Sequence, residues 1–410
     1  MTRTQSFALV GGGMAAVHAA ETLRLEGFCG RVLLISEENR LPYDRPPLSK
    51  ALLTGDMTFD GCLLRPASWY DEYGIDLMLG VRVQSLDPHT SRLRLGTGAE
   101  IRFDRALIAT GARPQTLGGL ANSSDTVLAL RTADDAEKIR AALVPGTHLA
   151  VIGGGFIGAE LASSATALGC EVTMFEATAA PMAAVLGERI AHSLVSLYRA
   201  NGIRVLTGTP VRELNTGPRG VEITSADRRT WRADAVVVSA GAVPNVELAS
   251  AAGLRVSDGI EVDETAATSA PHIFAAGDVA NRPETRFGGR VRIEHWQNAQ
   301  NQGASAARAM IGQRAPFGEV PWFWTDQFGL NMQVTGFPHR ADRVVERGSI
   351  EEGRFAAYYL SGRSLVAALG VGRAGEVHLA RRLIAEKAEV ACEALADTGL
   401  RAAVLYAAEA

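Results

Sequence analysis

Residues 7–16 read Phe-Ala-Leu-Val-Gly-Gly-Gly-Met-Ala-Ala, a short apolar run followed directly by three glycines. Helical spacing continues from Val17 to Leu25, and a second apolar run, residues 31–37, ends in Glu37. Strand, glycine turn, helix, strand and acid in this order form the dinucleotide-binding fingerprint. We therefore predict a parallel α/β sheet that binds a nucleotide at the glycine turn.

Each position of the fingerprint has its own physical task. Gly11 permits the tight turn, Gly13 lets the backbone approach a pyrophosphate, and Ala16 keeps the helix close to the strand. The free amides and the dipole of the helix N-terminus favour an anion, and the terminal carboxylate accepts hydrogen bonds from ribose hydroxyls. The residues predicted at this first site are Gly11, Gly13, Met14, Ala15, Ala16 and Glu37.

The same pattern occurs a second time, beginning at Gly153. An apolar run, residues 149–152, leads into Gly-Gly-Gly-Phe-Ile-Gly at 153–158, a helical pattern follows from Ala159 to Leu168, and the next strand ends in Glu176. One such turn could serve packing alone, but two copies with matching acids indicate two nucleotide sites. The residues predicted at the second site are Gly153, Gly155, Phe156, Ile157, Gly158 and Glu176.

Three further strand ends carry small residues and glycine. Residues 104–114 and 234–244 resemble each other, and their apolar strands end in Ala109-Thr110-Gly111 and Ala240-Gly241. Such turns lie at the carboxyl edge of a doubly wound sheet, where ligands bind, although a strand exit can need glycine for its own sake. Residues 268–278 form another strand that ends in Gly277-Asp278, where the acid could bind a ribityl chain or cap the next element.

Composition narrows the function classes. A length of 410 residues suggests two to three domains, and 41 basic against 45 acidic residues give a net charge of -4, which disfavours nucleic-acid binding. The four cysteines are far apart, so neither a disulfide framework nor a metal site is expected. We see no apolar run that could span a bilayer and no signal peptide, and we expect a soluble cytoplasmic protein.

Three segments resemble a known family. Residues 42–50 (Pro-Tyr-Asp-Arg-Pro-Pro-Leu-Ser-Lys), 294–303 and 321–327 (Pro-Trp-Phe-Trp-Thr-Asp-Gln) are similar to the FAD-dependent NADH:ferredoxin reductases of bacterial Rieske ring-hydroxylating dioxygenase systems. The resemblance covers nearly the whole chain and is nearest to the toluene and biphenyl dioxygenase reductases, which are putidaredoxin reductase-like. It implies that the first site holds FAD and the second NAD(P), and Glu176 favours NADH because a carboxylate repels a 2′-phosphate.

The resemblance also implies a fold and a partner. We expect two Rossmann-like domains of the glutathione-reductase type and a small α+β C-terminal domain. The expected FAD domain covers residues 1–112 and 243–318, the NADH domain 113–242 and the C-terminal domain 319–410. Electrons are expected to pass singly to a [2Fe-2S] Rieske-type ferredoxin, which supplies an aromatic-ring dioxygenase as the terminal oxygenase.

The C-terminal part has patterns of its own. Residues 354–360 and 364–370 read as a β-hairpin around Ser361-Gly362, and 377–394 reads as one or two amphipathic helices. In the family this part covers the flavin and helps to dock the ferredoxin. Five arginines could face an acidic partner or be ordinary solvated surface: Arg340, Arg343, Arg347, Arg381 and Arg382.

By resemblance, Lys50 and Glu160 form the catalytic pair, with the ammonium near the flavin N5 and the pair orienting the nicotinamide. Their ordinary interpretations are a solvated helix residue and a first-turn acid. The other residues expected at FAD are Arg45, Val83, Ala109, Thr110, Gly111, Arg131, Gly277, Asp278, His295, Trp296 and Trp324, and Ala240 and Gly241 are expected at NADH. The two tryptophans could instead be core residues and the arginines surface residues.

Two features separate this chain from related enzymes. Residues 41–50 contain no cysteine, so dithiol chemistry has no nucleophile there, and Cys62 is predicted to be a packed thiol. Residues 181–186 lack an arginine that relatives often carry, which affects one NADH contact. Competing hypotheses are a ferredoxin or rubredoxin reductase of a P450 or alkane hydroxylase system, an NADH oxidase or peroxidase, and a non-enzymatic FAD protein for which NADH is a conformational signal.

Overall fold

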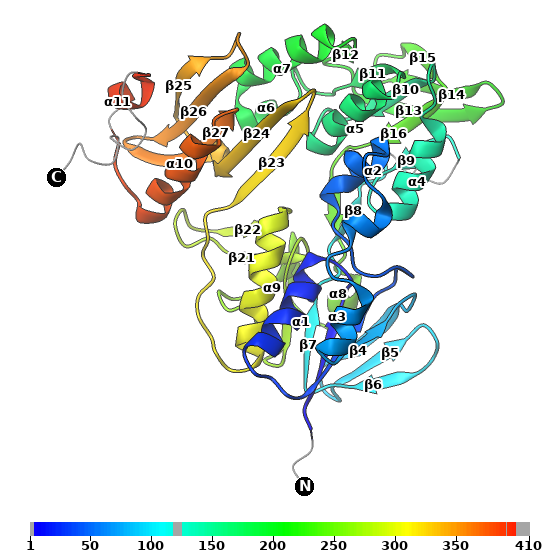
Figure 1. Cartoon of the computed structure of the whole chain (residues 1–410), viewed down its shortest axis with the longest axis vertical. Coiled ribbons are helices and arrows are strands. Elements are labelled where there is room, and N and C mark those ends of the chain that lie inside the picture. The colour runs from blue at the N-terminus through cyan, green and yellow to red at the C-terminus, as the bar shows by residue number, and fades with distance from the viewer. Residues whose placement is uncertain (1–3, 118–124, 391, 399–410) are drawn as a thin grey trace. The chain divides into compact units, whose positions relative to one another are not determined.

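The computed structural model describes residues 4–117, 125–390 and 392–398, and it divides the chain into two compact units (Figure 1). Unit 1 comprises Met1–Asp44, Phe59–Arg113 and Ala242–Glu319, and unit 2 comprises Arg45–Thr58, Pro114–Gly241 and Val320–Ala410. The C-terminal part thus shares a unit with the second fingerprint. The expected division into three domains stays a prediction.

Unit 1 is built on a parallel sheet with strand order β20-β7-β1-β2-β3. One face packs against helices α1 and α9, and the other packs against the small β4-β5-β6 sheet, because side chains of β1 alternate between two apolar clusters. The main elements are β1 (Ser6–Val10), α1 (Met14–Leu25), β2 (Arg31–Ile35), β3 (Ile75–Met78), β7 (Arg105–Ile108), β20 (Ile273–Ala275) and α9 (Trp296–Met310).

Shorter elements complete unit 1 or lie at its boundary. They are η2 (Phe59–Cys62), α3 (Ala67–Glu72), β4 (Val83–Asp87), β5 (Arg92–Leu95), β6 (Glu100–Arg102), β8 (Ala112–Pro114), β17 (Ala242–Pro244), α8 (Glu247–Ala251), β18 (Val256–Ser257), β19 (Gly259–Glu261), β21 (Ala280–Pro283) and β22 (Arg290–Arg292). The strand expected over 268–278 is shorter in the structure, where only β20 is a strand. The hydroxyl and the backbone N–H of Thr268 both donate to the carbonyl of Ile273, which makes a turn of this segment. Pro271 also interrupts the strand, because it has no N–H to donate.

Unit 2 repeats this plan with a parallel sheet of order β12-β11-β10-β16-β9. The strand–helix–strand unit β10–α5–β11 matches β1–α1–β2, which confirms the predicted repeat. The elements are η1 (Pro46–Ser49), α2 (Ala51–Thr54), β9 (Val127–Ala129), α4 (Ala133–Ala142), β10 (His148–Ile152), α5 (Phe156–Ala167), β11 (Glu171–Phe175), α6 (Ala183–Leu186), α7 (Glu188–Ala200), β12 (Arg204–Leu206), β13 (Val211–Gly217), β14 (Gly220–Ser225), β15 (Thr230–Ala233) and β16 (Ala235–Val238).

The C-terminal part of unit 2 is an antiparallel sheet of order β23-β24-β27-β26-β25. Its elements are β23 (Trp322–Gln327), β24 (Leu330–Gly336), η3 (Pro338–Arg340), β25 (Arg343–Ser349), β26 (Arg354–Ser361), β27 (Ser364–Val371), α10 (Ala374–Glu386) and α11 (Cys392–Ala396). The β26–β27 hairpin is confirmed. The predicted helical stretch is two helices, since α10 ends where Lys387 turns into left-handed backbone with φ 56°.

The structure also bears on two further expectations, which concern membrane-spanning segments and the state of Cys62. Within the described ranges, no helix is long and apolar enough to cross a membrane. Cys62 is 1% exposed and burial raises the pKa of its thiol, so the prediction of a packed thiol is confirmed.

Candidate functional site

The first glycine turn lies in unit 1, where β1 leads into α1. Gly11 has φ +135°, and a Cβ there would lie 2.2 Å from the carbonyl oxygen of Ala109, so only glycine fits. A Cβ on Gly13 would meet nothing within 4 Å, and no side chain caps the start of α1. This open, uncapped helix N-terminus fits an anionic pyrophosphate.

The Gly-Asp strand end lies beside this turn. A Cβ on Gly277 would come within 3.1 Å of the Ala15 Cβ, and the Gly277 N–H donates to Gln302 of α9 at 2.9 Å. Burial lowers the pKa of His295, at the start of α9, to about 4, and the nearby Asp278 carboxylate opposes this shift. Unit 1 therefore gathers the ends of β1 and β20 and the starts of α1 and α9.

The remaining predicted residues of unit 1 have structural partners. The Trp296 indole donates to Asp44 Oδ1 at 2.7 Å, and the Thr110 hydroxyl donates to the carbonyl of Asn245 at 2.8 Å. Glu37 forms an exposed ion pair with Arg82, 3.4 Å apart, and Val83 packs against the apolar cluster beneath β4. These contacts hold the strand ends in place.

The second glycine turn, in unit 2, has the same geometry. Gly153 has φ +99°, with the Ser239 carbonyl oxygen 2.3 Å from a hypothetical Cβ, and a Cβ on Gly155 would again meet nothing within 4 Å. The Glu176 carboxylate accepts from the Gly154 N–H at 3.0 Å and from the Thr178 N–H and hydroxyl, both at 2.7 Å. The acid is thereby held beside the turn, where a ribose would lie.

Two predicted arginines of unit 2 are brought together. Arg45 Nη1 donates to the Arg131 carbonyl oxygen at 2.5 Å, and the Arg131 N–H donates to Asp135 at 3.1 Å. Asp135 also belongs to the capping box that begins α4 with Thr132. The start of α4 thus fixes the backbone that Arg45 binds.

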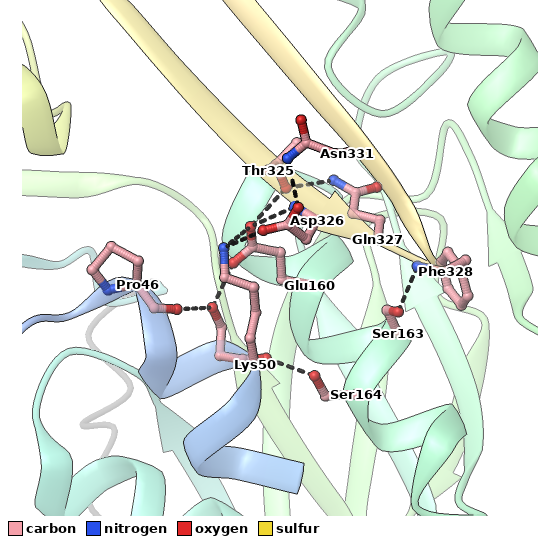
Figure 2. Close-up of polar contacts among 11 residues, drawn as sticks. Pro46, Lys50, Glu160, Ser163, Ser164, Thr325, Asp326, Gln327, Phe328 and Asn331 are labelled. Atoms are coloured by element: carbon pink, nitrogen blue, oxygen red, sulfur yellow. Dashed lines mark hydrogen bonds and ion pairs between the residues drawn. The ribbon is translucent and has the colours of Figure 1, made fainter. Parts of the chain in front are cut away.

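Lys50 and Glu160 meet in unit 2, together with Asp326 (Figure 2). Lys50 Nζ lies 3.3 Å from Glu160 Oε1 and 3.1 Å from Asp326 Oδ2, and it lies 5.5 Å from the centre of the Trp324 ring. These residues come from three segments far apart in the chain, namely η1–α2, α5 and β23 (Figure 2). An ammonium is thus held between two carboxylates next to the second glycine turn.

Neutral donors satisfy the Glu160 carboxylate. It is 7% exposed and accepts from the Ser49 hydroxyl at 2.5 Å, from the Thr325 hydroxyl at 2.7 Å and from the Asp326 N–H at 3.3 Å. Buried carboxylates need such partners, because desolvation otherwise opposes their charge. The hydroxyl donors explain how a charged side chain is kept inside the unit.

Local sequence explains how these groups are presented. Pro46 and Pro47 preset the backbone of η1, which ends at Ser49, and Glu160 lies on the first turns of α5. Along β23, alternation directs Thr325 to one face of the sheet and Asp326 to the other. Aromatic contacts support the strand, since Phe323 packs edge-on against Phe156 with ring centres 4.6 Å apart.

The predicted site residues are divided between the units. Unit 1 holds Gly11, Gly13, Met14, Ala15, Ala16, Glu37, Val83, Ala109, Thr110, Gly111, Gly277, Asp278, His295 and Trp296, and unit 2 holds Arg45, Lys50, Arg131 and Trp324 together with all the residues expected at NADH. The second group contains Gly153, Gly155, Phe156, Ile157, Gly158, Glu160, Glu176, Ala240 and Gly241. Ile157 is 46% exposed, which is high for a large apolar side chain.

Sequence reasoning missed Ser49, Thr325 and Asp326 as site residues. All three stand in segments that carried the family resemblance, and that was the available signal. The suggestion that Arg347 faces a partner was wrong. Arg347 is 4% exposed, because it donates to backbone carbonyls of Leu395 and Asp397 and lies beside Glu376.

Comparisons with known proteins agree with this geometry. The model of the pyridine nucleotide-disulphide oxidoreductase family matches residues 5–303, and a reductase C-terminal model matches 322–404. The chain is 39% identical to the anthranilate 1,2-dioxygenase system ferredoxin–NAD(+) reductase component of Burkholderia cepacia, over 95% of this chain and 97% of that protein. It is 36% identical to rhodocoxin reductase of Rhodococcus erythropolis, over 96% and 92% of the two chains.

Solved structures give the same result. The putidaredoxin reductase of a covalent complex with putidaredoxin superposes with a TM-score of 0.95 at 32% identity, covering 98% of both chains. The ferredoxin reductase for the CYP199A2 system from Rhodopseudomonas palustris superposes with a TM-score of 0.94 at 35% identity, covering 98% of this chain and 99% of that one.

Proposed function

Since the chain belongs to the pyridine nucleotide-disulphide oxidoreductase family, we propose that it is an FAD-dependent NADH:ferredoxin reductase. The observation that carries the proposal is the Lys50–Glu160 pair, which unit 2 holds beside a nucleotide-binding turn. When bound, FAD accepts a hydride from NADH and releases the two electrons one at a time. The chain's own residues bind and orient the two dinucleotides for this chemistry.

The two glycine turns have the binding task. The uncapped starts of α1 and α5 offer backbone N–H groups and a positive helix end to a pyrophosphate, FAD at the first and NADH at the second. Glu176, held by its three donors, accepts from the adenosine ribose of NADH and repels the 2′-phosphate of NADPH. Asp278 binds the ribityl chain of FAD.

Lys50 and Glu160 have the orienting task at the reacting end. The Glu160 carboxylate is fixed on α5, in the helix that starts at the NADH turn, and it pairs with the Lys50 ammonium, so that the two side chains together orient the nicotinamide. The Lys50 ammonium supplies positive charge where negative charge develops during hydride transfer. Trp324 and Phe156 contribute apolar surface that excludes water.

The electron acceptor follows from the relatives. Several carry ferredoxin–NAD(+) reductase in their names, and one solved structure is a complex with putidaredoxin. We propose a [2Fe-2S] ferredoxin that supplies an aromatic-ring dioxygenase. The reductase for the CYP199A2 system is nearly as similar, at 35% identity, and it favours a P450 system as the second candidate. Because its electron source is NADH, we place the activity in the cytoplasm.

A peroxidase and a protein that only senses NADH have less support. A peroxidase of the cysteine type needs a reactive cysteine in the segment after the first acid, but residues 41–50 contain none, and Cys62 further along is buried with a raised pKa. A protein that uses NADH only as a signal has no need for an ammonium held between carboxylates beside the turn. The two functions are distinguished from a reductase by different measurements. In a sensor, NADH reduces the flavin slowly, and in a peroxidase the electrons go to an oxygen species and not to a ferredoxin.

The test is an anaerobic assay of the FAD-loaded chain with NADH and a panel of [2Fe-2S] ferredoxins. We expect ferredoxin reduction that depends on NADH and is at least tenfold slower with NADPH. Oxygen consumption without any ferredoxin, at the rate of ferredoxin reduction, would support the oxidase instead. The assay is repeated with ferredoxins from dioxygenase systems and with ferredoxins from P450 systems. The class with the higher kcat/KM is the preferred acceptor.

A further inference from the structure

We propose that Asp326 is a positioning residue for the Lys50 ammonium, which it holds together with Glu160. The proposal rests on the proposed function in one respect, since Lys50 is taken to act at the site of hydride transfer. It assigns to the C-terminal sheet a role in the reaction chemistry, in addition to any part in protein docking. The reasoning begins with the two carboxylates that Lys50 contacts (Figure 2).

Glu160 is only one of the two carboxylates that hold Lys50. Its two oxygens already accept from two hydroxyls and a backbone N–H, and its distance to Lys50 Nζ is 3.3 Å. Charge-assisted hydrogen bonds between an ammonium and a carboxylate are usually about 2.7–2.9 Å long, so neither this contact nor the 3.1 Å contact with Asp326 is short, and the two carboxylates hold the ammonium jointly. The position of Glu160 is therefore set by its neutral donors, and Lys50 needs a second anchor.

Asp326 supplies that anchor at a shorter distance. Its Oδ2 atom lies 3.1 Å from Lys50 Nζ, while its Oδ1 atom accepts from the Asn331 side-chain amide at 2.7 Å. Asp326 and Asn331 are cross-strand partners in the β23–β24 hairpin, so this bond is built into the register. One carboxylate oxygen fixes the group and the other is turned to the ammonium.

The exposed fractions agree with this division. Lys50 is 20% exposed at its side chain, Glu160 8% and Asp326 44%, so the ammonium lies between a buried carboxylate and one at the surface. A lysine side chain has many rotamers, so holding its ammonium in one place costs conformational entropy. Without Asp326, Lys50 keeps only the Glu160 contact at 3.3 Å and its contact with the Trp324 ring. Its ammonium would then spend less time in the position that the proposed reaction requires.

Asp326 therefore affects the rate and leaves nucleotide binding largely unchanged. Among the hydrogen bonds of the described residues, Asp326 has none to Glu176 or to the NADH turn at Gly153–Gly155. Its removal should lower the limiting rate of hydride transfer and change the dissociation constant of NADH little. A purely structural role would instead lower FAD content or thermal stability and leave the rate per bound flavin intact.

The experiment compares Asp326→Asn, Asp326→Glu and Asn331→Ala with the unmodified holoenzyme. Glu346→Gln is the matched control, because Glu346 belongs to the same C-terminal sheet and pairs with Arg189. Anaerobic stopped-flow gives the limiting rate of flavin reduction by NADH and the NADH dissociation constant. A second readout is the rate at which N-hydroxysuccinimidyl acetate acylates Lys50, followed by mass spectrometry.

We expect Asp326→Asn to lower the limiting rate about tenfold with less than a threefold change in NADH dissociation, and to raise Lys50 acylation several-fold. Asp326→Glu should restore most of the rate, and Asn331→Ala should shift both readouts two- to threefold in the same direction. Rates and acylation equal to those of the unmodified protein in Asp326→Asn would overturn the proposal, as would equal effects in Glu346→Gln. If NADH does not reduce even the unmodified protein, the proposed function fails, and acylation alone still decides whether Asp326 holds Lys50.

Discussion

At the scale of single residues, Lys50 has the most direct part in the proposed chemistry. We expect Lys50→Ala to slow flavin reduction by NADH about 10- to 100-fold while FAD stays bound, because a positive charge near the developing negative charge is lost. Stopped-flow absorbance measures the rate. Lys138→Ala, an exposed lysine on α4, serves as the control. Unchanged reduction kinetics would remove Lys50 from the mechanism.

The Glu176 carboxylate decides the choice of nicotinamide cofactor. We expect Glu176→Ala to lower the ratio of kcat/KM for NADH over NADPH at least tenfold, since it removes both the ribose contact and the repulsion of the 2′-phosphate. The assay is flavin-dependent dye reduction with each cofactor. Glu171→Gln, which changes an exposed acid at the start of β11, the strand that ends directly before Glu176, should keep the original ratio. An undiminished ratio in Glu176→Ala would contradict its ribose role.

His295 makes stability depend on pH. Its folded-state pKa of about 4 lies below the ordinary value of 6.5 because of burial, so the unfolded chain binds the proton more readily between these values. The stability contributed by the neutral ring is present above pH 6.5 and is lost as the pH falls toward 4. Urea unfolding of FAD-free protein at pH 7 and pH 5 should differ by on the order of 1–2 kcal/mol from this group.

The variant His295→Gln isolates that contribution. Its stability difference between pH 7 and pH 5 should be smaller than that of the unmodified protein, because glutamine does not titrate. His192→Gln is the control, since His192 is exposed on α7. A pH dependence that is the same in His295→Gln would show that the histidine is not buried in its neutral form.

At the scale of elements, the contact between α1 and α9 holds the FAD turn to the Gly-Asp strand end. A Cβ on Gly303 of α9 would lie 2.2 Å from the Ala15 carbonyl oxygen of α1. We expect Gly303→Ala to destabilise unit 1 by about 1–3 kcal/mol and to weaken FAD retention, because the helices must separate. Ser305→Ala on the same helix should change both little, and equal stability of the two variants would contradict this packing.

Some helix and strand boundaries could be predicted from sequence patterns, and others could not. The β26–β27 hairpin was predicted at its observed place, because its two apolar runs and the Ser361-Gly362 turn give a strong local signal. Helices α1 and α5 begin three residues earlier than their apolar spacing indicated, at Met14 and Phe156. In both helices the residue directly after the third glycine is already helical. The first turn of a helix is too short to show a periodic apolar pattern, so the sequence does not mark where the helix starts.

At the scale of the whole molecule, the internal repeat determines most of the fold. Two glycine turns, two acids and two small-Gly strand ends predict both parallel sheets, since each motif specifies a local backbone geometry. Asp326 could not be predicted this way, because it meets Lys50 across 276 residues of sequence. Arg347 shows the opposite error, as composition alone does not distinguish a buried arginine from a surface one.

The central claim is that one chain transfers a hydride from NADH to its own FAD and passes the electrons to a ferredoxin. Its most direct test is an anaerobic titration of the FAD-loaded chain with NADH, followed through the flavin absorbance, and then addition of an oxidised [2Fe-2S] ferredoxin. The account predicts that about one NADH per flavin bleaches the spectrum, and that about two ferredoxins per flavin, each taking up one electron, restore it. A flavin that stays oxidised in excess NADH, or a chain that binds no FAD, would contradict the account.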